Sequence, residues 1–416
     1  MLALVSVAYL DRICIATAAP SIARDLRFDP EQMGLVFSAF TLSYALFEIP
    51  SGHFADRFGA RAALTRIVLW WSSMTALTGA AVGFGSLLGC RFLFGMGEAG
   101  VFPSMARVYG SWLPERERGR AFGVTIATGA VAGAATLKLV SFLLAVPLSW
   151  RVLFVVFGGA GLVWVAVFRI YFRDDPREHP GVSPDELASI RPEAPAAHVT
   201  PMPAQAPPSE RDSKLAGLSR PRFIGPLCLM YAAAIYGWYF HLTWMPTYLR
   251  EARGFDIASA GTMSALPLLG IAAGVSVGGW ASDRLAARFG PTGRRWPGAI
   301  GFPAAAIVTC LAATAESSRA AAVLLALSAG LGALGVAPAW PVCVEVGRSR
   351  AGVLSGAMNM CGNLGGTLCP IAVGMCLKRL GSWQFALDLV AAAYLVAGVA
   401  WLAVDLRKEP AANASS

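Results

Sequence analysis

The chain has 416 residues, of which 56% are hydrophobic and only 14% are charged, and its mean hydropathy is +0.57. Soluble globular domains carry roughly 25% charged residues, so this composition excludes an ordinary soluble protein and predicts a multi-span helical membrane protein. The formal net charge of +9 does not indicate nucleic-acid binding, because the chain shows no zinc-ligand spacing and no basic stripe interleaved with aromatic residues.

Twelve apolar segments follow one another along the chain, each long enough to cross about 30 Å of hydrocarbon. Six precede a polar, proline-rich stretch and six follow it, which predicts an all-α protein with two six-helix bundles. The expected parts are an N-terminal bundle (1–172), a cytoplasmic linker (173–222) with one short helix near SPDELASI, a C-terminal bundle (223–409) and a cytoplasmic tail (410–416). The expected spans are 1–22, 33–52, 63–83, 87–109, 119–145, 152–172, 223–248, 261–281, 297–315, 320–341, 352–376 and 385–405.

Loop charges predict the orientation of these spans. Lysine and arginine concentrate in the loops after spans 2, 4, 8 and 10 and in the linker, so the positive-inside rule places these segments and both termini in the cytoplasm. The cytoplasmic tail that usually precedes a first span is missing, which leaves room for a start upstream of Met1. The eight cysteines form no C-x-x-C pair, so we expect neither a metal site nor a redox centre.

Charged residues interrupt the first and fourth predicted spans. Asp11 and Arg12 lie in the middle of the first, and Arg91 and Glu98 lie in the fourth. A charge at the centre of a span costs about 2.5–3.5 kcal/mol even on the mildest scale, so these residues are candidates for function. The spacing of Arg91 and Glu98 places both on one helix face, roughly 10 Å apart along the axis, so they cannot bond each other. Glu98 is near mid-span, whereas Arg91 is close enough to a helix end that snorkelling toward water is an equal alternative.

The guanidinium of Arg12 is the strongest candidate for binding an anionic group, because arginine stays charged and its planar fork suits a carboxylate. Lys138 in the fifth span either binds a second anionic group or snorkels along the outer half of its helix. The second half offers aromatic and amide side chains instead of charges. The candidates there are Tyr236, Trp244, Asn359 and Asn363, and the two asparagines share a helix face and bind either a ligand or a neighbouring helix.

An internal repeat follows the second span of each half. GHFADRFG at 52–59 aligns with GWASDRLA at 279–286, which predicts two parallel halves with a site between them at mid-membrane. The paired acids predict a gate at the cytoplasmic side, with simple orientation-setting charge as the alternative. The gate residues would be Gly52, Asp56, Arg57, Arg61, Asp283 and Arg284.

The stretch GHFADRFGAR resembles the loop 2–3 signature of the major facilitator superfamily, G-x-x-x-D-R-x-G-x-R. Several other stretches resemble the anion:cation symporter family of that superfamily, which includes bacterial inner-membrane proton symporters of sugar acids and other organic acids. They are YLDRICIATAAP, RFLFGMGEAGVFPS, WLPERERGRAFG, DPREHPGVSPDEL, YFHLTWMPTYL and SGAMNMCGNLGG, and the resemblance covers essentially the whole chain.

The resemblance implies roles for the charged residues of spans 1 and 4. Arg12 would hold the substrate's anionic group, Asp11 and Glu98 would carry protons, and Arg91 would couple the two events. Tyr44 resembles a binding-site tyrosine of the family, although packing alone explains it equally well.

The fifth span departs from the resembled family in two ways. Thr125, Thr128 and Gly129 stand where its sugar-acid carriers tend to have a glutamine, and Lys138 stands where apolar or small residues are usual. We therefore expect a less hydroxylated acid with two anionic groups. Glu48, Glu345 and Asp388 receive no specific role.

The sequence thus predicts a monomeric multi-pass carrier of a bacterial inner membrane that imports an organic carboxylate together with protons. It is not expected to be an enzyme, to need a cofactor or metal, or to bind nucleic acid. Two alternatives remain open at this point. A membrane sensor of the same ligands would need a docking segment, and only the linker is long enough; an exporter or exchanger would not require a central arginine such as Arg12.

Overall fold

The computed structural model describes residues 1–146, 148–190, 221–347 and 351–406, and every regular element in these ranges is a helix. Helices of the first half are α1 (Leu2–Leu26), α2 (Pro30–Phe58), α3 (Ala60–Thr78), α4 (Phe84–Glu98), α5 (Val101–Trp112), α6 (Glu115–Ala145) and α7 (Trp150–Tyr171). The linker carries η1 (Pro176–Glu178) and α8 (Pro184–Ile190), the latter at the expected SPDELASI stretch. Helices of the second half are α9 (Pro221–Thr243), α10 (Met245–Glu251), α11 (Ile257–Phe289), η2 (Pro291–Arg294), α12 (Arg295–Thr314), α13 (Ser318–Val336), α14 (Ala339–Gly347), α15 (Ala351–Leu380) and α16 (Trp383–Ala403).

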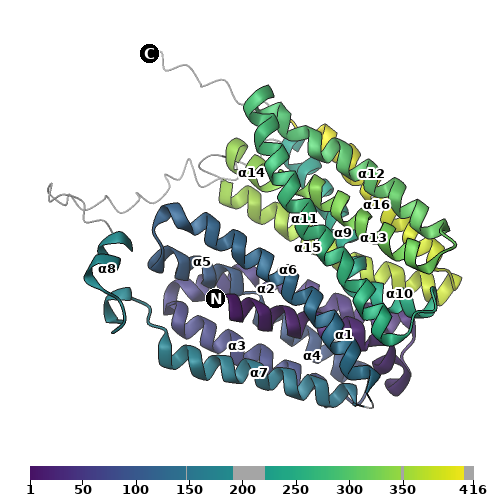
Figure 1. Ribbon diagram of the computed structural model, residues 1–416, viewed down its shortest axis with the longest axis horizontal. Helices are drawn as coiled ribbons and strands as arrows, with labels where there is room; N and C mark the ends of the chain where they lie inside the picture. The colour runs from purple at the N-terminus through teal and green to yellow at the C-terminus, as the bar shows by residue number, and fades with distance from the viewer. Residues whose placement is uncertain (147, 191–220, 348–350, 407–416) are drawn as a thin grey trace.

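These helices fall into two bundles that lie side by side, α1–α7 and α9–α16 (Figure 1). The described residues contain all twelve predicted spans, but three of the spans are broken into two helices each: α4/α5, α9/α10 and α13/α14. By length and composition alone, nine segments of the described chain are apolar enough to cross a membrane. The predicted all-helical architecture of two bundles is confirmed.

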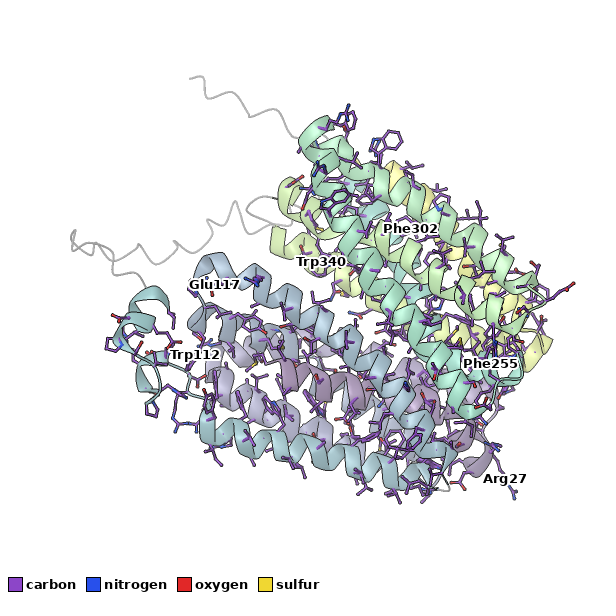
Figure 2. The ribbon with its side chains drawn as sticks, viewed as in Figure 1. Arg27, Trp112, Glu117, Phe255, Phe302 and Trp340 are labelled. Carbon is purple, nitrogen blue, oxygen red and sulfur yellow. The ribbon has the colours of Figure 1, made fainter. Side chains whose placement is uncertain are left out.

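The outer surface of the bundles is apolar, as a lipid environment requires. Large hydrophobic side chains such as Ile170 and Val399 are 78% and 71% exposed on helices that otherwise pack inward. The interior of each bundle is filled by aromatic and small residues; Phe302, for example, is fully buried inside the C-terminal bundle (Figure 2).

We call the two ends of the molecule the linker end, where α7 ends and α9 begins, and the far end, where α1 gives way to α2. At the far end, buried residues of the first half such as Cys14, Phe37 and Leu87 belong to one hydrophobic core with the second half. Toward the linker end, the first half has a separate core around Leu64 and Phe94. The halves are therefore packed into one another at the far end and form separate cores at the linker end.

Close backbone approach and ion pairs join α2 and α15 at the far end. A Cβ on Gly34 would run into the carbonyl oxygen of Pro370, so only glycine allows this contact. Lys378 Nζ lies 3.0 Å from Asp29 Oδ2 and 2.8 Å from Glu31 Oε2. A hydrogen bond from the backbone N–H of Gln32 lowers the pKa of Asp29, so its carboxylate stays charged, and the ion pair intact, well below neutral pH.

Candidate functional site

The site is built around an ion pair between the first and fourth spans. Arg12, in the middle of α1, donates from Nη2 and Nε to Oε1 of Glu98 at 2.7 and 3.2 Å. Glu98 is the last residue of α4, next to the break before α5. Glycines weaken a helix, and the run FGMGEAG places Gly95, Gly97 and Gly100 around this acid. The sequence therefore breaks the fourth span at its buried carboxylate.

The two partners of this ion pair differ in their access to water. The side chain of Glu98 is 1% exposed, and its second oxygen, Oε2, is buried without a hydrogen-bond partner among the described residues. The side chain of Arg12 is 18% exposed, and its Cζ atom lies 5.0–5.5 Å from the ring centroids of Tyr9, Phe40 and Tyr44. Cation–π contacts with three rings hold the guanidinium in place while part of it stays free for another anion.

Asp11 is the most deeply buried acid of the site. It is 0% exposed, and neither carboxylate oxygen has a hydrogen-bond partner in the part of the chain that the structure describes. The indole of Trp71 lies beside it, but its Nε1 atom also lacks a partner there. The charges of Glu98 and Arg91 act on Asp11. The structure thus brings Asp11, Arg12, Arg91 and Glu98 into one electrostatic cluster.

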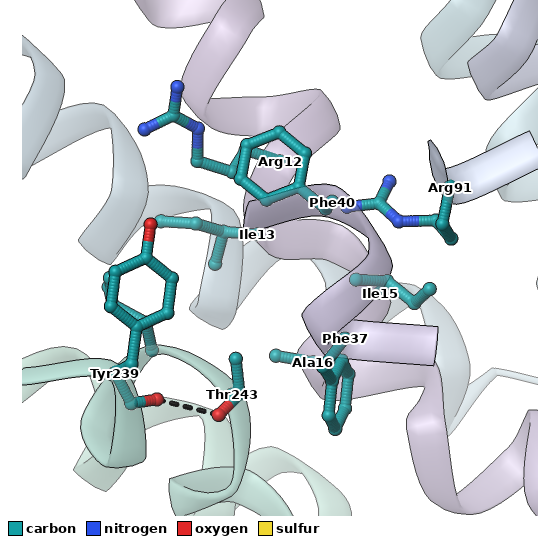
Figure 3. Close-up of a pocket in the computed structure, with 10 residues that line it drawn as sticks. Arg12, Ile13, Ile15, Ala16, Phe37, Phe40, Arg91, Tyr239 and Thr243 are labelled. Carbon is teal, nitrogen blue, oxygen red and sulfur yellow. Dashed lines mark hydrogen bonds between the residues drawn. The ribbon is translucent and has the colours of Figure 1, made fainter. Parts of the chain in front are cut away.

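Arg91 faces the interior of the first half and does not snorkel. It is 2% exposed, and its Nε and Nη1 atoms have no hydrogen-bond partner among the described residues. Its Cζ atom stacks on Phe94 at 4.4 Å and lies 5.3 Å from the ring centroid of Phe40. The Phe40 ring lies between Arg91 and Arg12 (Figure 3). Of the two alternatives for Arg91, the structure therefore favours a site residue.

A narrow cavity lies next to this cluster, between the two halves, and both arginines line it (Figure 3). α9 of the second half contributes Tyr239 and Thr243, and the Thr243 hydroxyl donates to the carbonyl oxygen of Tyr239 at 2.6 Å. Phe40, Tyr239 and Thr243 were not among the predicted site residues, although Tyr239 and Thr243 share the helix face of the predicted Tyr236. The full lining is Arg12, Ile13, Ile15, Ala16, Phe37, Phe40, Arg91, Tyr239, Leu242 and Thr243.

The predicted aromatic residues have different surroundings. Tyr44 is 8% exposed, and its ring lies beside the Arg12 guanidinium. Tyr236 is partly buried against the hydrophobic core. Trp244 occupies the break between α9 and α10, where its Nε1 donates to the carbonyl oxygen of Pro370 at 3.3 Å and its ring meets Phe37 edge-on. Trp244 therefore packs the closed far end and does not line the cavity.

The structure does not bring Lys138 to the cavity. It lies on the exposed face of α6, together with Val131 and Phe142, whereas the opposite face of α6 packs on α1 and α11. On the buried face, Thr125 pairs with the hydroxyl of Tyr109 at 2.5 Å, and Gly129 leaves room for the ring of Tyr9. Of the two alternatives for Lys138, its position favours snorkelling.

Of the two predicted asparagines, Asn359 joins helices of different halves. Asn359 on α15 donates from Nδ2 to both carboxylate oxygens of Glu48 on α2, at 3.1 and 2.9 Å. The side chain of Asn363 has no hydrogen-bond partner among the described residues, and its carbonyl oxygen accepts from the Thr367 hydroxyl at 2.8 Å. For Asn359, the structure favours a bond to a neighbouring helix over a free ligand group.

The described gate residues make contacts within their own half. Arg294 bridges Asp283 at 2.7 Å and Glu345 at 2.5 Å, all in the second half. Arg61 donates from Nη2 to the carbonyl oxygen of Arg169 in the first half. Arg57 and Arg284 are exposed and lie against the rings of Phe58 and Trp280 on their own helices. Gly52 and Asp56 lie outside the residues whose side chains are described.

Comparison with known proteins decides the family. The sequence matches the Major Facilitator Superfamily over residues 1–370. The chain belongs to this superfamily. It is 34% identical to a probable sulfoacetate transporter of Cupriavidus necator, over 91% of this chain and 86% of that protein. It is 31% identical to a D-galactonate transporter of Escherichia coli (96% and 92%) and 32% identical to a probable galactarate/D-glucarate transporter of the same species (95% and 89%).

A solved structure of a bacterial homolog of the human lysosomal transporter Spinster, in an inward-facing and unoccupied conformation, has the same fold. It aligns with a TM-score of 0.76 at 20% identity, over 97% of this chain and 95% of that chain. This likeness shows the fold. The family and the sequence relatives show that the protein is a membrane transporter of organic anions and not an enzyme.

The close packing of α4 against α2 positions Glu98 for its ion pair with Arg12, and a substitution at Gly95 tests this packing. A Cβ on Gly95 would run into the carbonyl oxygen of Phe40 and the hydroxyl of Ser43 on α2. We expect Gly95→Ala to cost about 1–3 kcal/mol of stability and to reduce transport, because it pushes Glu98 away from Arg12. Gly89→Ala on the same helix has open space around it and is the matched control. Equal melting temperatures and uptake rates in both variants would contradict this packing.

Proposed function

We propose that this transporter is a proton-coupled symporter that imports a small organic acid by alternating access. Arg12 would bind the acid's carboxylate, and Glu98 and Asp11 would carry protons. The observation that supports this most is the Arg12–Glu98 ion pair, in which the arginine is partly open to the cavity and the glutamate is buried.

A proton and the substrate act on different partners of this ion pair: the proton competes with Arg12 for Glu98, and the substrate competes with Glu98 for Arg12. While Glu98 is charged, it occupies Nε and Nη2 of Arg12, the pair of donors that would grip a carboxylate. Protonation of Glu98 removes its charge and frees the guanidinium for the substrate. Removing one partner of a buried ion pair costs about 3–5 kcal/mol. States in which Arg12 has neither Glu98 nor substrate as its counter-charge are therefore disfavoured. Binding of the proton and binding of the anion would therefore favour each other.

Asp11 would take part in a second protonation step. Its carboxylate makes no hydrogen bond that a proton would have to break, and the charges of Glu98 and Arg91 act on it. A change in the charge of Glu98 therefore alters the electrostatic environment of Asp11, and the Arg91 guanidinium links the two acids. Arg91 would in this way couple the protonation of Asp11 to events at Arg12.

Packing of the two halves supports the direction of access. The far end is closed by a common core and by the Lys378 ion pairs, while the linker end has separate cores. By the positive-inside rule, the arginine-rich loops at the linker end would face the cytoplasm of a bacterial inner membrane, as would both termini. The structure would then represent an inward-facing state in which substrate leaves toward the cytoplasm.

The substrate we propose is a short acid with two anionic groups and few hydroxyls. Arg91 supplies a second cation on the cavity lining, beyond the Phe40 ring from Arg12. The relatives include a probable sulfoacetate transporter as well as sugar-acid transporters, and the buried face of α6 carries Thr125 and Gly129 rather than an amide. Lys138 is no longer part of this proposal because of its position.

Proteoliposomes with a trapped pH dye test this function without a labelled substrate. Adding an acid to one side should acidify the lumen only if the acid enters together with protons, and sulfoacetate and malonate should be more effective than galactonate. Empty liposomes control for passive entry of protonated acids. Substrate entry with no lumenal acidification would refute proton symport, and a preference for galactonate would refute the proposed substrate class.

A further inference from the structure

Helices α2 and α15 form one antiparallel seam between the halves, and most of its contacts are neutral. Near the cavity, Ser38 donates to the carbonyl oxygen of Thr367 at 2.6 Å, and the hydroxyls of Thr367 and Thr41 lie 3.1 Å apart. The last described side-chain hydrogen bond toward the linker end is between Glu48 and Asn359. Because Glu48 contributes a carboxylate, this hydrogen bond between the halves is charge-assisted. It lies beyond the cavity, on the linker side.

Glu48 is coupled by position to the Arg12 site. It lies one helical turn beyond Tyr44 and two turns beyond Phe40, and both rings contact the Arg12 guanidinium. Of the described residues, Arg12 from α1 acts on Glu48 through its charge, and Glu48 in turn acts on Tyr44 of its own helix and on Tyr231 and Tyr239 of α9. Arginine stays charged and tyrosine stays neutral near neutral pH, so these neighbours keep a constant charge as the pH changes.

We propose that the Glu48–Asn359 hydrogen bond is the contact through which α15 responds to the state of the Arg12 site, which makes Glu48 a positioning residue for transport. The bond needs a carboxylate on one side and an N–H donor on the other, since Nδ2 of Asn359 serves both oxygens of Glu48. Because α2 carries Glu48 and two of the rings around Arg12, Phe40 and Tyr44, a movement of α2 that follows those rings also shifts the carboxylate relative to α15. This inference rests on the proposed symport function and adds a third acid to the transport pathway.

Two variants test this role: one adds a second carboxylate, and the other exchanges the amide and the carboxylate between the two positions. In Asn359→Asp, two carboxylates face each other, and they can share a hydrogen bond only when one is protonated. The maximal uptake rate should fall at least about tenfold at neutral pH, the loss expected for a hydrogen bond to a charged group, and should recover as pH is lowered. Glu48→Gln/Asn359→Asp restores one amide and one carboxylate, so it should recover uptake at neutral pH. The substrate KM should stay within about threefold of wild type throughout, because neither residue lines the cavity.

Failure of this inference can be told apart from failure of the symport proposal. Binding-driven exchange of substrate across the liposome membrane needs movement of the halves but no proton gradient, so it is measured alongside net uptake. If wild type exchanges substrate without proton entry, symport is wrong but the Asn359→Asp effect on exchange should persist. If Asn359→Asp matches wild type at every pH, or if the folded double variant is no faster than Asn359→Asp, the positioning role of Glu48 is overturned.

Discussion

Lysine in place of Arg12 is expected to raise the substrate concentration for half-maximal uptake by roughly 10- to 100-fold, the value of one to two strong charge-assisted hydrogen bonds. A lysine keeps the positive charge and can still pair with Glu98, so the fold should survive. It cannot present two parallel N–H groups to a carboxylate, and it loses much of the stacking on Tyr9, Phe40 and Tyr44. The measurement is substrate affinity of the purified protein, together with uptake in proteoliposomes.

The matched control for this variant is Arg319→Lys, at an exposed position outside the site, which should leave both quantities unchanged. An Arg12→Lys variant with wild-type affinity would show that the substrate's anionic group binds elsewhere, with Arg91 as the next candidate.

Glutamine in place of Glu98 is expected to separate binding from coupling. The amide resembles a permanently protonated glutamate, so Arg12 is free and the substrate should bind at least as tightly as in wild type. Accumulation against a concentration gradient should fall about 100-fold or more, since a group that cannot lose its proton cannot release it on the other side. Exchange of internal for external substrate, which needs no net proton movement, should continue.

Accumulation and exchange are both measured in proteoliposomes, with Glu316→Gln at an exposed position as the control. Loss of exchange together with accumulation would indicate that Glu98 has a structural role. Normal accumulation would shift the proton site to Asp11 alone.

Composition and hydropathy are enough to predict the fold of this transporter, because twelve apolar segments in water-free surroundings have few alternatives to a helical bundle. The three broken spans were not predicted, since periodicity averaged over a whole segment does not register a local break. For the fourth span the signal was available: three glycines around Glu98 in FGMGEAG favour a break at this acid.

The charged residues of the site were predictable because charges inside membrane spans are rare. A buried charge is costly in a membrane, so Asp11, Arg12, Arg91 and Glu98 were conspicuous as residues. Their pairing was not, because the Arg12–Glu98 contact joins residues 86 positions apart and depends on how α1 packs against α4. Burial of Arg91 likewise depended on tertiary packing, since its distance from the helix end allowed either outcome.

Neutral site residues were harder to predict. Phe40, Tyr239 and Thr243 line the cavity, but their residue types are equally common in cores, and helix phase alone does not say which face meets the other half.

Lys138 shows the opposite error: a rare charge in a span suggested a functional role, but its helix face points outward. Glu48 received no role because its partner, Asn359, lies 311 positions away in the other half.

The central claim is that the substrate anion at Arg12 and a proton at Glu98 favour each other's binding, because each of them breaks the same ion pair. Calorimetric titration of substrate into the purified transporter, repeated in buffers of different ionisation enthalpy, counts the protons taken up on binding. Wild type is expected to take up about one proton per substrate near neutral pH, and Glu98→Gln correspondingly fewer, with a flatter dependence of affinity on pH. Binding without proton uptake in wild type, or identical uptake in both proteins, would contradict the claim.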